Sequence, residues 1–98
     1  RERTFQQDIE DAGEIRREVA ALARQLVEDL KDDGRLAERV VVKVRFKPFF
    51  TSTHGVPLPE PSLEPDALEA GAMAALAKFE LDRPVRLLGV RLELAPPA

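Results

Sequence analysis

The 98-residue sequence has no cysteine, tryptophan or tyrosine, and it contains a single histidine and a single methionine. Without cysteine the chain can form no disulfide, no thiolate metal site and no cysteine nucleophile. The single histidine, His54, has no second imidazole with which to complete a zinc site, so we expect it to be exposed or to make a weak phosphate contact. The chemistry of this chain therefore has to come from charged, hydroxyl and amide side chains.

Membrane-spanning segments, signal peptides and common catalytic motifs are absent from the sequence as well. No apolar run approaches the roughly 18 residues that a membrane span needs, and the start, "RERTFQQD", is too polar for a signal peptide. The sequence contains no Gly-rich phosphate loop and no nucleophile elbow. The acids of "EDLKDDG" fall in the last turns of a predicted helix, which favours a solvated helix end over a pair of catalytic metal ions. We expect a non-catalytic domain with no cofactor and no membrane contact.

What is present fits one small domain, residues 1–98. Hydrophobic residues make up 44% of the chain, enough for a single core, while 34% of the residues are charged and the formal net charge is -3. The abrupt polar start and the "APPA" at the end suggest cuts through a longer chain, so we expect a fragment of a larger protein.

Helical periodicity marks two segments. The first has Asp11 as a plausible N-cap and Gly34 just past its end, and it predicts a helix at about 11–33. Pro65 favours the first turn of a second helix at about 65–80. The helical residues that we expect to be largely buried are Val19, Leu22, Leu26, Leu76 and Phe79.

Strict alternation marks "VVVKVRFKPFF", residues 40–50. Period two predicts a strand at about 39–47 with one buried face and one open face. Weaker patterns predict strands in "RTFQQDIE", "FFTSTHGV" and "RPVRLLGVRLEL", whereas the proline-rich "PLPEPSLEP" predicts a loop. The buried parity of the alternating strand carries Val40, Val42, Val44 and Phe46, and its open parity carries Lys43, Arg45 and Lys47.

These elements give the order β-α-β-β-α-β. The predicted fold class is therefore α+β, with a four-stranded antiparallel sheet and two helices on one face. The last strand has a conflict of parity, because unbroken alternation would bury Arg86 without a partner. One extra residue at Leu88-Gly89, a β-bulge, would bring Arg86 and Arg91 to the same open face.

The uncovered face of this sheet is the candidate functional surface. Cations mixed with hydroxyls and amides suit phosphate oxygens, although an ordinary solvated sheet can also carry lysine and arginine. An acidic chain can bind phosphate if its local field is positive, and we expect most acids on the first helix, away from this face. The candidate residues are Thr4, Gln6, Lys43, Arg45, Lys47, Thr51 or Ser52, Thr53, Arg86 and Arg91.

Three segments, "ERTFQQDI", "VVVKVRFKPFF" and "RPVRLLGVRLEL", resemble in order and spacing the C-terminal little-finger domain of Y-family translesion DNA polymerases, of the bacterial DNA polymerase IV type. The resemblance covers nearly the whole chain. It implies a sheet that lies in the major groove and grips the backbones of double-stranded primer-template DNA. Many relatives carry arginines in the stretch where this chain has His54 and Val56. The residues to which the resemblance assigns the grip are Thr4, Lys43, Arg45, Arg86 and Arg91.

The resemblance also implies partners. Polymerase IV enzymes dock on the sliding clamp partly through a patch that corresponds here to Pro57, Leu58 and Pro59. Leu58 is a candidate clamp contact; the alternative is a loop leucine that covers the edge of the core. The catalytic carboxylates and their magnesium ions would belong to the rest of the polymerase chain, acting in the bacterial cytoplasm.

Other functions share this topology. A small-ligand regulatory domain is the main alternative, and it predicts metabolite binding without salt-sensitive DNA binding. RNA-recognition domains expose aromatic rings on the sheet, for which Phe49 and Phe50 are the candidates here. An acylphosphatase-like site would want an asparagine, which the sequence lacks. A module that binds only the clamp is a further alternative.

Overall fold

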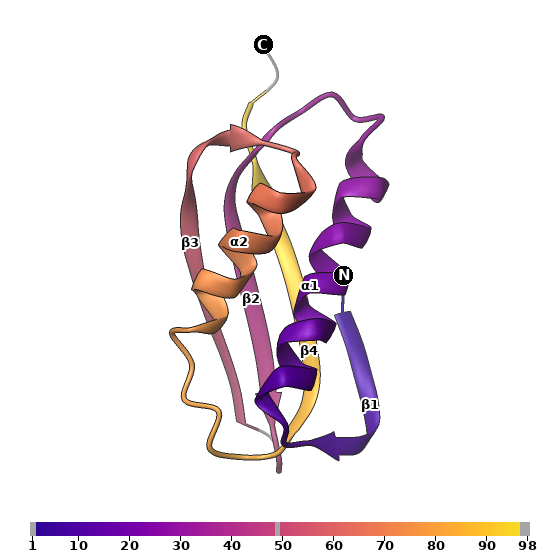
Figure 1. The fold of residues 1–98 in the computed structure, drawn as a ribbon, viewed down its shortest axis with the longest axis vertical. Helices are drawn as coiled ribbons and strands as arrows, with labels where there is room; N and C mark the ends of the chain where they lie inside the picture. Colours follow the sequence, from indigo (N-terminus) through magenta and orange to yellow (C-terminus); the bar gives the residue numbers. More distant parts are fainter. Residues whose placement is uncertain (1, 49, 97–98) are drawn as a thin grey trace.

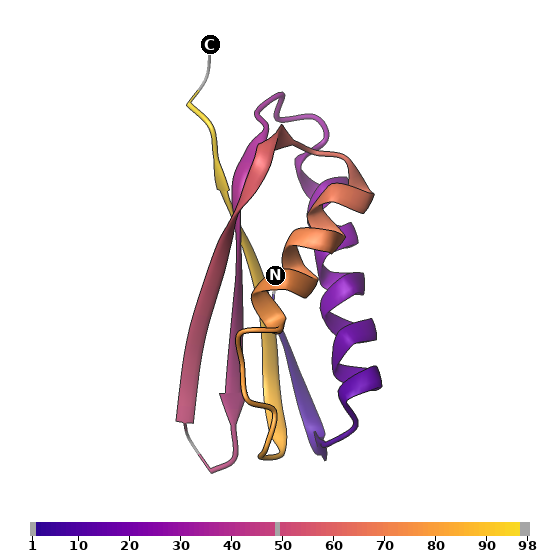
Figure 2. The same ribbon diagram turned by 60° about the vertical axis from the view of Figure 1, so that its left-hand side comes forward.

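The computed structural model describes residues 2–48 and 50–96 and folds them into two layers, a sheet and a pair of helices (Figure 1). Figure 2 shows both helices on one side of the sheet and the other side uncovered. The predicted element order and the α+β class are confirmed. The elements are β1 (Glu2–Ile9), α1 (Ala12–Leu30), β2 (Ala37–Phe46), β3 (Phe50–Ser62), α2 (Pro65–Leu76) and β4 (Val85–Leu94).

The described residues form one four-stranded sheet in the order β1-β4-β2-β3, with antiparallel pairing between neighbours. The last strand along the chain, β4, therefore lies between β1 and β2. This order makes β2 and β4 the central strands, and both carry basic residues on the uncovered side. The two central strands can therefore present their cations side by side.

Both helices begin where the sequence predicts and end earlier. The Asp11 side chain accepts a hydrogen bond from the backbone N–H of Gly13 at 3.0 Å, which satisfies one of the free donors at the start of α1. Helix α1 ends at Leu30 with Lys31 as its C-cap, and in the turn that follows the Asp33 N–H donates to the Leu30 carbonyl at 3.0 Å. Beyond Leu76 the backbone continues in turns rather than in helix α2.

The core lies between the helices and one face of the sheet. Val40, Val42 and Val44 of β2 are fully buried, as their shared parity predicts. The other residues predicted to be buried are buried too, except Leu26 and Phe79, which are half-buried against the core. Aliphatic packing of both helices onto one sheet face therefore leaves the opposite face free.

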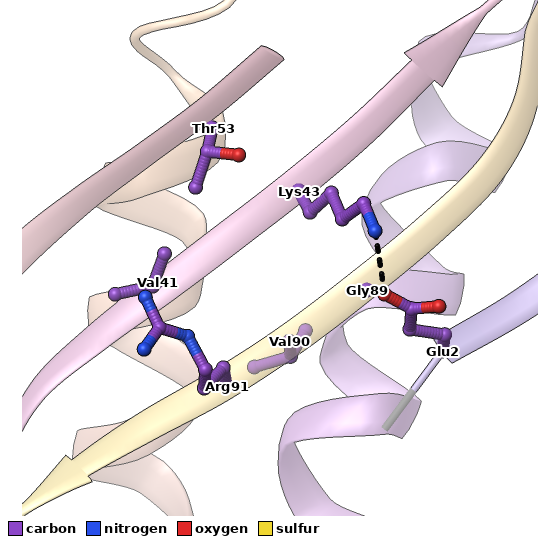
Figure 3. A pocket seen from close by; sticks show the side chains of 7 residues that line it. All are labelled: Glu2, Val41, Lys43, Thr53, Gly89, Val90 and Arg91. Atoms are coloured by element: carbon purple, nitrogen blue, oxygen red, sulfur yellow. Dashed lines mark hydrogen bonds and ion pairs between the residues drawn. The ribbon is translucent and has the colours of Figure 1, made fainter. Parts of the chain in front are cut away.

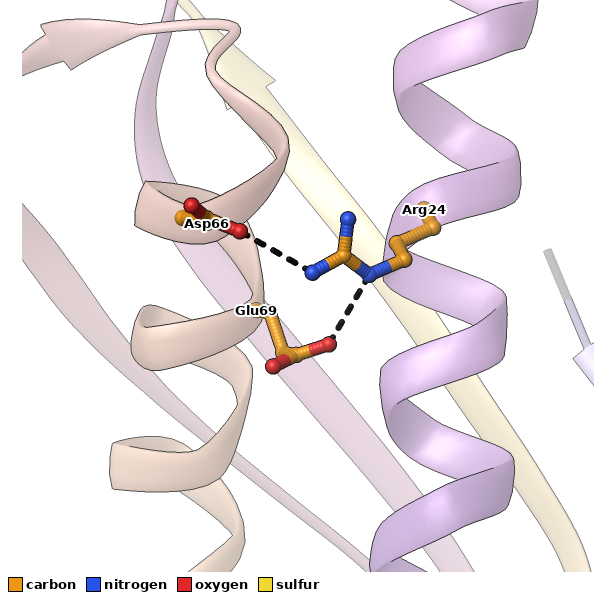
Figure 4. A network of polar contacts seen from close by, with 3 residues as sticks. All are labelled: Arg24, Asp66 and Glu69. Atoms are coloured by element: carbon orange, nitrogen blue, oxygen red, sulfur yellow. Dashed lines mark hydrogen bonds and ion pairs between the residues drawn. The ribbon is translucent and has the colours of Figure 1, made fainter.

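The two helices are also joined on their outer side. Arg24 of α1 donates to Glu69 at 2.9 Å and to Asp66 at 3.0 Å, both on α2 (Figure 4). All three side chains are exposed to solvent, so the network orients the helices more than it stabilises them.

The proline-rich stretch after residue 56 is not a loop, contrary to the sequence prediction. β3 continues through it to Ser62. Proline is tolerated there because β3 is an edge strand, and a missing N–H costs no ladder bond on the open side. The pairing is irregular in this stretch: two residues of β2, from Arg39 to Ala37, are matched by five of β3, from Pro57 to Ser62. Residues 57–62 are therefore extended but paired irregularly with β2, and their proline content is the reason why the sequence predicts a loop.

The predicted irregularity in β4 exists, but its predicted position is wrong. Leu87 pairs with Arg45 and Val85 pairs with Phe46, so the extra residue is Arg86 itself. From Leu87 to Glu93 the pairing with β2 is regular, so nothing is inserted at Leu88-Gly89. The consequence is that Leu87 lies on the uncovered side of the sheet, opposite Arg45.

Candidate nucleic-acid interface

The register gathers the predicted residues into two neighbouring rows across the uncovered face. Residues directly opposite one another on paired strands share a face, so each row can be read from the pairing. One row contains Glu2, Gly89, Lys43 and Thr53, and the next contains Thr4, Leu87, Arg45 and Thr51. Five of the predicted residues thus lie together: Thr4, Lys43, Arg45, Thr51 and Thr53. Ser52, the alternative to Thr51, has the opposite parity and faces the helices.

Arg45 stands at the centre of this surface. Its guanidinium Nε donates to the Thr51 hydroxyl at 3.2 Å, across the β2–β3 pair. Within the described part of the chain no carboxylate forms an ion pair with Arg45. A hydroxyl leaves the charge of Arg45 uncompensated, so this side chain can attract an external anion directly.

The other cations are paired with carboxylates. Lys43 lies 2.9 Å from Glu2, and Arg91 lies 3.8 Å from Glu93. Near the end of the sheet, Asp8 lies between two cations. Its carboxylate is 3.2 Å from Arg86 Nε and 3.4 Å from Lys47 Nζ. The expectation that acids lie mainly on the helix side therefore left out three carboxylates that stand beside candidate phosphate ligands.

The Lys43–Glu2 pair crosses a shallow hollow on the sheet surface (Figure 3). The hollow has a volume of about 450 Å³. The hydrogen bond from Lys43 lowers the pKa of Glu2, because the ammonium group favours the charged form of the carboxylate. The residues that line the hollow are Glu2, Val41, Lys43, Thr53, Gly89, Val90 and Arg91.

Arg86 and Lys47 lie apart from the two rows. Arg86 occupies the bulge, and its Nε contacts Asp8 without the geometry of a hydrogen bond. Asp8 brings Arg86 and Lys47 together at one end of the sheet, whereas Arg91 stands opposite Val41 further along β4. The basic residues are therefore spread along the sheet. The side chain of Gln6 lies outside the described part of the structure, and so does Phe49.

His54 is not on this surface, and the expectation that it would be exposed or touch phosphate is wrong. It is half-buried on the helix side, with its ring edge-on to Phe79 at 4.6 Å between centroids. Val56, of the same parity, packs against the core. The side chains of His54 and Val56 therefore point away from the uncovered face.

The predicted clamp contacts split between solvent and core. Pro57 and Pro59 are exposed, whereas Leu58 is half-buried and packs against the core. A Cβ atom added to Gly71 of α2 would lie only 2.9 Å from Leu58 Cδ2. Leu58 thus fills the space that Gly71 leaves open, as expected of a residue that covers the core edge.

The described residues contain neither a metal-binding cluster nor a membrane-spanning helix. Among residues 2–48 and 50–96 no group of three histidine, cysteine, aspartate or glutamate side chains could hold a metal ion, so these residues do not fit a polymerase metal centre. In the same ranges, no helix combines the length and the apolar character that crossing a membrane requires.

Comparison with known proteins places this chain in a family. Residues 1–97 match the family described as the impB/mucB/samB family C-terminal domain. DNA polymerase IV 2 of Mycobacterium tuberculosis (strain ATCC 25618 / H37Rv) is 45% identical over 92 residues, covering 94% of this chain and 27% of the relative. DNA polymerase IV of Halorhodospira halophila is 38% identical over 97 residues, covering 98% and 27%. The chain thus spans about a quarter of the length of these curated relatives.

Solved structures agree with that match. A structure described as a complex of the beta-clamp processivity factor and the little finger domain of PolIV has a TM-score of 0.77 and 28% identity, covering 100% of this chain and 88% of that one. An insertion ternary complex of Dbh DNA polymerase shares the fold, with a TM-score of 0.63 and 15% identity over 96% of this chain and 27% of that one. The chain therefore belongs to the impB/mucB/samB C-terminal domain family, the little-finger domain of Y-family DNA polymerases.

Proposed function

We propose that this domain is a non-catalytic DNA-binding part of a translesion DNA polymerase, which grips the phosphate backbone of primer-template DNA in the major groove. The observation that carries the proposal is the pair of rows on the uncovered face. They place two cations, Lys43 and Arg45, among three threonine hydroxyls. Ammonium, guanidinium and hydroxyl donors match phosphate oxygens, which position a protein on DNA without reading its sequence.

The surface chemistry favours duplex backbone over exposed bases. Single-stranded RNA is usually read by aromatic rings that stack on bases from the sheet. Phe46 and Phe50 are cross-strand partners on the helix side, where Phe46 is buried and Phe50 is 57% exposed, and Phe5 and Phe79 pack against the core. The described phenylalanines therefore leave the uncovered face to charged and hydroxyl groups. A regulatory domain for a small ligand has weaker support, because the hollow on this face lies open on a sheet surface.

The chemistry of nucleotide addition would lie elsewhere in the protein. The relatives are named DNA polymerase IV, and this chain matches about a quarter of their length. We therefore infer that the domain works as one part of a larger polymerase in the bacterial cytoplasm. Magnesium and its carboxylate ligands would belong to the rest of that polymerase chain.

A sliding clamp is the proposed second partner. Support comes from the similar solved domain, described as a complex with the beta clamp, and from the exposure of Pro57 and Pro59 on β3. We propose that these two prolines form the accessible part of the contact. Leu58 would then act mainly by holding this part of β3 against α2.

The DNA-binding proposal is tested by a salt titration with short duplexes of unrelated sequence. We expect a Kd in the range of about 10⁻⁴–10⁻⁶ M and, for four phosphate contacts (Lys43, Arg45, Arg86 and Arg91), a slope of log affinity against log salt of about -3 to -4. Arg45→Ala should weaken binding similarly on every duplex and reduce the slope by about one. Arg17→Ala makes the same charge change on α1 and should have little effect.

Two results would contradict the proposal. One is an Arg45→Ala variant that matches the wild type in both affinity and slope. The other is an affinity that depends strongly on base sequence. In the full polymerase, loss of Arg45 should reduce the grip on primer-template and the processivity, while the rate of nucleotide addition stays unchanged.

A further inference from the structure

The Lys43–Glu2 ion pair spans three strands of the sheet. Lys43 lies on β2 and Glu2 on β1, and their common cross-strand neighbour is Gly89 on β4. The Glu2 carboxylate lies over β4 at Gly89, and Lys43 extends toward it from β2, so that Lys43 Nζ is 2.9 Å from Glu2 Oε2 (Figure 3). A lysine of a central strand is thus engaged by a carboxylate two strands away.

Gly89 is the β4 residue that lies between Glu2 and Lys43. Glycine weakens a strand interior, and its presence there often marks a place where a ligand or another group approaches the backbone closely. Here the missing side chain leaves the floor of the hollow bare, with Lys43 and Arg91 at its sides and Thr53 beyond. The hollow therefore has two cationic donors and a hydroxyl at its rim, and backbone at its base.

We propose that this hollow seats one phosphate of the DNA backbone, and that the carboxylate of Glu2 is its built-in competitor. Carboxylate and phosphate are both oxyanions that accept charge-assisted hydrogen bonds from an ammonium group. In free protein Glu2 holds Lys43; on binding, a phosphate replaces Glu2 as the partner. The inference rests on the proposed function and adds Glu2 and Gly89 to the residues that govern it.

The exposure of the pair allows this exchange. The side chains of Lys43 and Glu2 are 35% and 51% exposed, so neither charge has to be stripped of water for the partners to separate. Lysine is a point charge on a flexible stem, which can swing from one oxyanion to another without a fixed geometry. Arg45, whose partner is a hydroxyl, needs no such exchange.

Glu2 gives a clearer test of competition than Asp8 does, because the two carboxylates differ in how many cations they contact. Asp8 contacts both Arg86 and Lys47, so its removal would change two partners at once. Glu2 has one cation within ion-pair distance among the described residues, and its removal should release that cation alone. Arg45 and the N-terminal amine also act on Glu2 through charge interactions, so a Lys43→Ala background is needed to assign the effect of Glu2→Gln to Lys43.

The test measures duplex DNA binding by the 98-residue chain carrying Glu2→Gln. We expect affinity at low salt to rise about two- to fivefold, the range that an exposed ion pair can contribute. The slope of log affinity against log salt should stay near that of the wild type, because Lys43 contacts a phosphate in both complexes and the variant only removes the cost of displacing Glu2. Glu28→Gln is the matched control. It removes a carboxylate that lies 3.5 Å from Lys31 on α1, and binding should stay within about 1.5-fold of wild type.

A double-mutant cycle identifies the mechanism. Adding Glu2→Gln to a Lys43→Ala chain should raise duplex affinity clearly less than it does in the wild type, since the cation to be released is gone and only the charge interactions with Arg45 and DNA remain. A gain of the same size with and without Lys43, or no gain in the single variant, would overturn the inference. Thermal melting of each variant confirms that the chains compared are folded.

The outcomes separate the inference from the proposed function. If wild type binds DNA and Arg45→Ala weakens it while Glu2→Gln behaves as Glu28→Gln, only the competition is wrong. If wild type and Glu2→Gln both fail to bind duplex DNA, the proposed function is wrong and the inference falls with it.

Discussion

The two faces of the sheet are held by different interactions, although the same strands supply both. On the helix side the β2 valines are fully buried, and their positions are set by packing that no ligand can replace. On the uncovered side Lys43, Lys47 and Arg86 are held by carboxylates that an external phosphate could replace. One face is therefore committed to stability, and the other stays available for binding.

Two adjacent leucines of β4 lie on opposite faces of the sheet and allow the two faces to be compared directly. Leu88 faces the helices and is 0% exposed, while Leu87 lies in the row of Arg45 and Thr4 and is 5% exposed. The uncovered face thus has an apolar floor, to which Val41 also belongs. Long cationic side chains can cover such a floor with their aliphatic stems and keep their charges in water.

The largest expected effect separates the two leucines. Leu88→Ala should cost about 2–5 kcal/mol of the free energy of unfolding, because it leaves a cavity between the sheet and the helices. Leu87→Ala should cost about 1–2 kcal/mol, since solvent and neighbouring side chains can fill the space at an open face. Urea denaturation of both variants measures the difference. Equal losses would mean that the faces do not differ in packing as described.

A smaller effect is expected at the rim of β3. Leu58→Ala removes a side chain that packs beside Gly71 and Val40, and it should cost about 1–2 kcal/mol in urea denaturation. Pro59→Ala, at an exposed neighbour, should be nearly neutral for stability. In a clamp-binding assay on folded protein, Pro59→Ala should weaken association more than Leu58→Ala does. A stable Leu58→Ala chain that has lost clamp binding would return Leu58 to the contact surface.

The sequence predicted the elements whose patterns are strong. The alternation of β2 fixes one buried face, and the cap at Asp11 begins α1 where expected. The strand in "PLPEPSLEP" was missed because proline composition signals a loop, and only the edge position of β3 makes a strand possible there. Amino-acid composition alone does not show whether a strand will lie at the edge of a sheet.

The candidate site was also predicted only in part, because local sequence patterns do not show the order of the strands. Parity places Lys43, Arg45, Thr51 and Thr53 on one face without any knowledge of the strand order. The ion pairs of Glu2 and Asp8 depend on β1 lying beside β4, a pairing between the two ends of the sequence. The bulge was misplaced because parity shows that a residue is extra but not where the ladder absorbs it. Local patterns therefore identify the face, and the topology decides how its charges are paired.

The most direct test of the account is an NMR titration that follows the side-chain Nε–H signals of the arginines as short duplex DNA is added. The signal of Arg45 on the uncovered face should shift most, and Arg91 and Arg86 should follow as DNA replaces their carboxylate partners. Arg16 and Arg17 are exposed on α1 and serve as internal controls whose signals should stay in place. The same pattern with two unrelated duplexes would support a grip on the backbone. Shifts at Arg16 and Arg17 as large as that of Arg45 would contradict the claim that the uncovered face binds DNA.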